Sequence, residues 1–174
     1  DEVLVNQDAI AVVDRSDIEI LKRRARLSRR GRARLCVHRS VEEAIHEMLI
    51  VHTKGSYIQP HKHPGKTVSY HVIDGELDLV IFEDDGTIVR AVKMGPHSSG
   101  LPFYWRLSKS LYYSVLPLTN MVVFNEVVNG PWERATSFIG APWSPDESDD
   151  EGASRFMESV RCLIHDHRMR KKHE

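Results

Sequence analysis

Two histidines spaced two residues apart, His61 and His63, are the strongest chemical signal in the chain. On a β-strand, residues i and i+2 point to the same face of the sheet, so the two imidazoles can converge on one point. Imidazole nitrogen is a good ligand for Zn, Ni, Cu and Fe, and the pair therefore predicts a divalent transition-metal site. The apolar-rich run Val68–Val72 then leads to Asp74–Gly75, a dipeptide typical of a hairpin turn.

Strand periodicity dominates the middle of the chain, from Glu47 onward. Short apolar segments separated by Gly- and Pro-rich joints predict an all-β double-sheet jelly roll or barrel. Asp84–Gly86 gives a second hairpin signal within this region. The expected strands are residues 47–53, 56–61, 67–73, 76–82, 87–93, 102–107, 111–116 and 121–128.

Segments whose apolar residues have helical spacing lie on both sides of this β region. Residues 1–15 are expected to form an arm or a short strand, and Ser16–Glu19 reads as a capping box that opens a helix through about Leu27. Residues 40–43 are expected to add one helical turn, and Ala153–His165 predicts a helix outside the barrel. We therefore expect one compact domain with three parts: an N-terminal extension (1–45), a barrel (46–140), and an acidic loop, helix and basic tail (141–174).

The composition is that of an ordinary globular domain, with 174 residues, 41% hydrophobic residues, 28% charged residues and a net charge of −1. This charge gives no general attraction to nucleic acid or to a membrane. No apolar run approaches the roughly 20 residues of a membrane-spanning helix, so no membrane partner is expected. Two cysteines are too few for a disulfide framework and favour a reducing compartment, which makes the cytoplasm the expected location.

The charges are segregated along the chain. Eight of the thirteen residues in Lys22–Arg34 are basic, and five of the six in Asp146–Glu151 are acidic. Such a basic run could contact phosphates, which makes nucleic-acid binding a minor alternative. The run lacks aromatic residues that stack on bases, and no known nucleic-acid module surrounds it. We instead expect the acidic segments to neutralise it, within the fold or across a dimer.

Seven stretches together resemble the cupin superfamily, specifically its WbuC-type cupin-fold metalloproteins. They are Arg32–His38, Glu47–Gln59, Pro60–Gly75, Phe82–Gly86, Phe103–Ser110, Asn129–Trp132 and Ala141–Glu147. The resemblance implies a cupin double-stranded β-helix (jelly-roll barrel), with an N-terminal helix and a C-terminal helix outside and a divalent metal inside. It also implies a homodimer paired through sheet edges and a place in surface-polysaccharide biosynthesis.

The resemblance carries over only part of the metal-binding set. His61 and His63 match the first two ligand positions, whereas Val68 stands at the carboxylate position and Tyr113 at the later histidine position. Tyr113 is expected to be either a phenolate ligand to Zn, Ni, Fe or Cu or a neutral pocket hydroxyl. His71 has the parity of a residue that faces away from the lumen and is the weaker candidate ligand.

Further polar residues are expected to line the lumen as a substrate pocket. Tyr70, Tyr104, Arg106 and Glu126 lie in strand-like runs, and Lys66 lies where it could meet an anionic substrate at the barrel mouth. An arginine such as Arg106 within an apolar run needs a partner, either an acidic side chain or a bound anion.

Two functions remain open at this stage. In the first, a metal at the histidine pair acts as a Lewis acid on a sugar or other polar metabolite, while Arg106 holds an anionic group and Tyr113 or Glu126 moves a proton. In the second, a metal-free degenerate cupin binds a small ligand or serves as an assembly module. The histidine pair favours the first function, and the missing carboxylate and fourth histidine favour the second.

Overall fold

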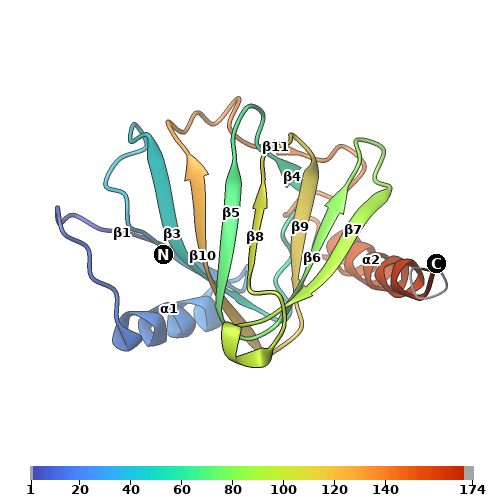
Figure 1. Ribbon diagram of the computed structural model, residues 1–174, viewed down its shortest axis with the longest axis horizontal. Helices are drawn as coiled ribbons and strands as arrows, with labels where there is room; N and C mark the ends of the chain where they lie inside the picture. Colours follow the sequence, from blue (N-terminus) through green and yellow to red (C-terminus); the bar gives the residue numbers. More distant parts are fainter. Residues whose placement is uncertain (1, 171–174) are drawn as a thin grey trace.

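The computed structural model describes residues 2–170, and within them two β-sheets face each other to form a barrel (Figure 1). The larger sheet has the strand order β1 (Val3–Val5), β2 (Arg32–Cys36), β3 (Ile45–Thr53), β10 (Met121–Asn129), β5 (Val68–Asp74) and β8 (Tyr104–Leu107). The smaller sheet has the order β11 (Ile139–Gly140), β4 (His61–Lys62), β9 (Tyr112–Pro117), β6 (Leu77–Phe82) and β7 (Ile88–Met94).

The main hydrophobic core fills the space between the inner faces of the two sheets. Alternate residues of a strand point to opposite faces. On β3, Met48 and Ile50 are therefore buried in this core, whereas Val51 is buried on the outer face under the N-terminal helix. Leu79 and Val115 meet the same core from the smaller sheet. This alternation fixes the register, because a slip of one residue would expose every core side chain.

Helix α1 (Arg15–Leu27) covers the outer face of the larger sheet. Its cap is Asp14, whose carboxylate accepts the N–H groups of Ser16 and Asp17, while the Asp17 side chain accepts the Asp14 N–H. The predicted capping box at Ser16 is therefore wrong by two residues, because a carboxylate at Asp14 satisfies the same free N–H groups. Leu21 and Ala25 are buried against the sheet, as the apolar spacing requires.

Helix α2 (Asp150–Arg170) lies against the outer face of the smaller sheet (Figure 1). Val160 and Ile164 pack in a second apolar cluster with Phe82 and Leu116. The helix extends past the predicted range of 153–165 at both ends. Acidic residues in its first turn favour the earlier start, because negative charge stabilises a helix N-terminus. Residues 171–174 of the predicted basic tail lie outside the described residues.

Two local predictions are wrong. The expected strand at residues 56–61 is reduced to β4, since Pro60 has no N–H to donate to a ladder, and the Ile58 carbonyl accepts instead from the Ser114 hydroxyl at 2.7 Å. Residues 40–43 form turns and a bend rather than a helical turn. The other predicted strands exist with boundaries shifted by one or two residues.

Part of the basic run is paired with acidic segments inside the fold. Arg30 bonds Glu2, and Arg32 forms a two-pronged ion pair with Glu147 whose Nη1–Oε1 distance is 2.8 Å. Arg29 also pairs with Asp150 at 3.2 Å. These contacts join the N-terminal segment, β2 and the start of α2. Among the described residues, no helix is long and apolar enough to cross a membrane.

Candidate functional site

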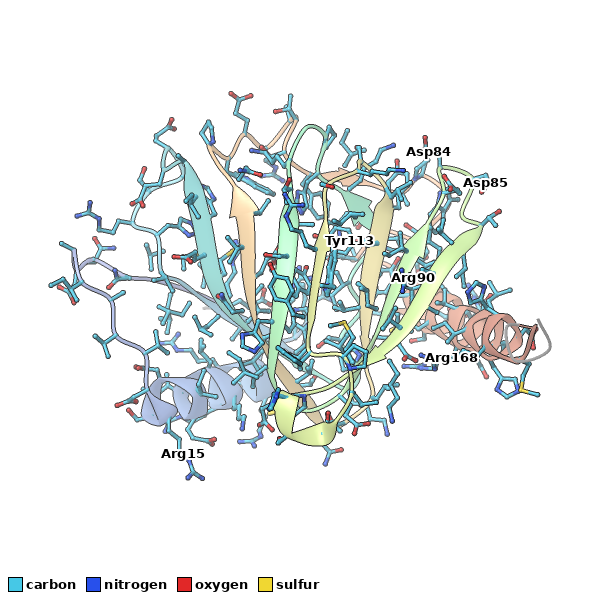
Figure 2. The ribbon with its side chains drawn as sticks, in the orientation of Figure 1. Arg15, Asp84, Asp85, Arg90, Tyr113 and Arg168 are labelled. Carbon is cyan, nitrogen blue, oxygen red and sulfur yellow. The ribbon has the colours of Figure 1, made fainter. Side chains whose placement is uncertain are left out.

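The space between the sheets contains a cavity of about 270 Å³. Its walls bring together residues far apart in the sequence: His61 and His63 from the β4 region, Tyr113 from β9, Tyr70 from β5 and Glu126 from β10. Figure 2 marks Tyr113, on β9, within the barrel. Apolar side chains and further charged side chains, among them Arg32 and Arg34, complete the cavity wall.

Strand register explains why these polar groups meet. Glu126 lies opposite Met48 of β3 on one side and opposite Tyr70 of β5 on the other. On the facing sheet, His61 lies directly opposite Tyr113. Tyr70 and Tyr113 then approach each other across the barrel, with their hydroxyl oxygens 3.4 Å apart. The larger sheet thus supplies the carboxyl group and one phenol, and the smaller sheet supplies the imidazoles and the other phenol.

Both predicted histidines are buried, and a hydrogen bond to a main-chain carbonyl orients each ring. The Nδ1–H of His61 donates to the Gln59 carbonyl at 2.8 Å, and the Nδ1–H of His63 donates to the Ser137 carbonyl. Since a carbonyl oxygen can only accept, Nε2 of each ring carries the lone pair. Burial lowers the pKa of His61 to about 3 and also lowers the pKa of His63. Both imidazoles are therefore neutral hydrogen-bond acceptors at neutral pH.

A chain of hydrogen bonds runs from His63 through Tyr113 to Tyr70, whose hydroxyl interacts with the carboxyl group of Glu126. Tyr113 donates to Nε2 of His63 at 3.0 Å, and Tyr70 donates to Tyr113. The Tyr70 hydroxyl in turn lies within hydrogen-bonding reach of the Glu126 carboxyl group. Burial raises the pKa of both phenols well above 10, so both stay protonated. Burial also raises the pKa of Glu126 to about 7, against the opposing effects of the Arg34 charge and of the Tyr70 hydroxyl.

Sequence reasoning did not place His52 on the cavity wall, and it gave Arg32 and Arg34 a structural or pocket role only through the resemblance of their segment. His52 is buried, its Nδ1 has no hydrogen-bond partner within residues 2–170, and burial lowers its pKa to about 3. The signal for all three was strand parity. His52 shares its face of β3 with Met48 and Ile50, and the arginines alternate with residues of β2 that pack under α1.

Four other predicted site residues lie away from the cavity wall. Tyr104 and Arg106 are exposed, so their prediction as lumen residues is wrong: β8 turns the alternate residues Trp105 and Leu107 into the core. His71 is exposed on the outer face of β5, as its parity implies. The Lys66 ammonium group donates to the main-chain carbonyls of residues 129 and 131, at 2.8 and 2.7 Å.

The donor set does not fit a resident divalent metal. Val68 is a buried core residue at the position where the resemblance expects a carboxylate, and the raised pKa of Tyr113 keeps that phenol neutral. The convergent donors are thus two neutral imidazoles and a neutral hydroxyl, which supply no charge to offset a dication. Among the described residues, no three His, Cys, Asp or Glu side chains are grouped to hold a metal ion.

Comparison with known proteins tests the fold. A protein-family model described as a domain of unknown function, DUF6016, matches residues 13–94. The search of curated proteins finds no match. Among solved structures, protein SO0799 from Shewanella oneidensis shares 11% sequence identity over 64% of this chain and 74% of its own, with a TM-score of 0.52.

Two oxalate-acting enzymes also match. An oxalate oxidase in complex with the substrate analogue glycolate shares 14% identity over 67% of this chain and 58% of its own, with a TM-score of 0.51. Bacillus subtilis oxalate decarboxylase shares 16% identity with a TM-score of 0.45, and this chain spans 24% of its length. The two facing sheets and the likeness to SO0799 and to the oxalate oxidase confirm the predicted fold: the chain is an all-β cupin jelly roll with two helices outside.

Proposed function

We propose that this cupin binds a small hydroxylated organic acid in its barrel, without a resident metal. The observation that carries the proposal is the buried Nδ1 of His52, which has no partner within residues 2–170 and belongs to the cavity wall beside arginines. A buried polar atom without a hydrogen bond is costly, and a polar ligand that pairs with it removes that cost.

Arg34 supplies the charge that an organic acid requires. Arg32 is already held by Glu147, whereas Arg34 has no carboxylate within ion-pair distance in the part of the chain that the structure describes. A guanidinium group forms paired, charge-assisted hydrogen bonds with a carboxylate, and such bonds are stronger than those between neutral groups. The cavity therefore favours a ligand with at least one carboxylate.

The neutral histidines indicate the rest of the ligand. Nε2 of His61 can only accept a hydrogen bond, so it favours a hydroxyl group on the ligand. The resemblance to WbuC-type proteins supports a sugar-derived acid and a place in polysaccharide biosynthesis. The two free cysteines support a reducing compartment such as the cytoplasm.

Arg34→Ala is expected to weaken carboxylate binding at least about tenfold, because it removes the unpaired cation of the cavity. Binding would be measured by calorimetry with glycolate, oxalate, gluconate and galacturonate, and with inorganic phosphate as a non-carboxylate anion. Arg90→Ala is the matched control, since Arg90 is exposed on β7 of the other sheet (Figure 2). An equal loss of carboxylate affinity in the two variants would contradict the proposal, and so would a wild type that binds none of these carboxylates.

A further inference from the structure

Glu126 is a buried carboxyl group in the middle of the inner face of the larger sheet. The titratable and charged groups that act on it are Arg34 and Cys36 of β2, Tyr70 of β5 and Tyr113 of β9. Arg34 is the one cation of this set, and it is also the cation that the proposed function assigns to the ligand carboxylate.

Tyr70, at the end of the hydrogen-bond chain, can meet Glu126 in either of its two protonation states. Tyr70 has one hydroxyl hydrogen, and that hydrogen is donated to Tyr113. Tyr113 in turn donates its hydrogen to Nε2 of His63, which can only accept. While Tyr70 donates to Tyr113, only a protonated Glu126 can donate to the Tyr70 oxygen. When Tyr70 instead turns its hydrogen toward Glu126, the contact stabilises the carboxylate and lowers the pKa of Glu126.

We propose that the cavity takes up its organic anion together with one proton, and that Glu126 carries this proton. The inference rests on the proposed function. An anion bound at Arg34 screens the one cation near Glu126 and places a second negative charge within the same 270 Å³ cavity. A second negative charge close to the buried Glu126 disfavours joint ionisation, so one of the two charges is neutralised by a proton.

The imidazoles and phenols of the cavity wall and the nearby Cys36 thiol cannot take this role near neutral pH. The lowered pKa values of His52, His61 and His63 keep the three imidazoles neutral. The raised pKa values of the two phenols and of the Cys36 thiol keep these groups protonated. The pKa of Glu126, raised to about 7, lies where a bound anion can change its protonation.

The test is calorimetry with oxalate and glycolate, whose carboxyl groups stay ionised between pH 6.5 and 8.5. Titrations in two buffers of different ionisation enthalpy count the protons taken up. The wild type is expected to bind close to one proton per anion at about pH 8, and its Kd is expected to rise about tenfold from pH 7.5 to 8.5. Glu126→Gln, a neutral isostere, is expected to bind the anion with no proton uptake and no such pH dependence.

Glu158→Gln on α2 is the matched control, because Glu158 is exposed outside the barrel. Failure of the wild type to bind either anion at any pH overturns the proposed function, and this inference with it. Binding without proton uptake, or with the same uptake in Glu126→Gln, overturns this inference alone. If Glu126→Gln does not fold, infrared absorption of the wild-type carboxyl group at pH 8 decides: oxalate is expected to increase the protonated signal, and an unchanged signal overturns the inference.

Discussion

The protein is expected to lose about 7 kcal/mol of unfolding free energy between pH 6.5 and pH 3, which is comparable with the whole stability of a typical domain. The cause is the burial of His52 and His61 as neutral imidazoles, which lowers the pKa of each from 6.5 to about 3. As the pH falls through 6.5, these rings take up protons in the unfolded chain but not in the folded one. Unfolding therefore becomes more favourable.

Glu126 acts in the opposite direction over part of this range. Its pKa is raised from 4.5 to about 7, so between these values the folded state holds a proton that the unfolded state lacks. This proton offsets one histidine, and stability is expected to fall by about 1.4 kcal/mol per pH unit down to pH 4.5. Below pH 4.5 the offset ends, and the slope is expected to double to about 2.7 kcal/mol per pH unit.

Urea denaturation followed by circular dichroism at several pH values would measure these slopes. His52→Gln removes one titrating ring and is expected to lower the slope by about 1.4 kcal/mol per pH unit, whatever its effect on stability at pH 7. His97→Gln serves as the control, since His97 is exposed at the start of the short 3-10 helix His97–Ser99. An unchanged slope in His52→Gln would show that His52 is not held neutral in the folded state.

The barrel could be predicted from the sequence because strand signals are local. Alternation of apolar residues and the turn at Asp84–Gly86 identify the strands of the hairpin from β6 to β7 without any knowledge of the rest of the chain. The pairing of β10 with both β3 and β5 joins residues about fifty or more positions apart along the chain, and no local pattern specifies it. Only the resemblance to cupins indicated that topology.

The candidate site was predictable where spacing alone determines direction. His61 and His63 face one cavity because they are two residues apart, and His71 is exposed for the same reason of parity. Tyr104 and Arg106 were assigned to the wrong face of β8 for a different reason. Parity shows which residues share a face but not which face is inside, and on β8 the inner face belongs to Trp105.

Arg32 and Arg34 of the cavity wall illustrate a second limit of prediction from the sequence. A run of basic residues suggests a solvated or phosphate-binding surface, and the sequence does not show where β2 will lie. Only the pairing of β2 with β3 turns Arg32 and Arg34 toward the cavity, with Arg34 opposite Ile50 on the inner face. The ion pair of Arg32 with Glu147 then distinguishes the two arginines. Their different roles follow from tertiary contacts, which composition cannot reveal.

The double variant Val68→Glu/Tyr113→His is expected to bind Ni²⁺ or Mn²⁺ at least about 100-fold more tightly than the wild type, a gain of about 2.7 kcal/mol. Val68 shares the inner face of β5 with Tyr70, and Tyr113 is the register partner of His61. The two substitutions would add a carboxylate and a third imidazole to the existing pair. They would thereby supply the negative charge that the present donors lack.

Competition with a chromogenic chelator would measure the affinity of each variant, and thermal unfolding with and without metal would check that binding stabilises the fold. Adding His61→Gln to the double variant is expected to abolish the gain, because a site that uses the histidine pair cannot form without it. A gain that survives His61→Gln would place the metal elsewhere on the molecule. No gain in a folded double variant would mean that Val68 and Tyr113 do not converge on the histidines.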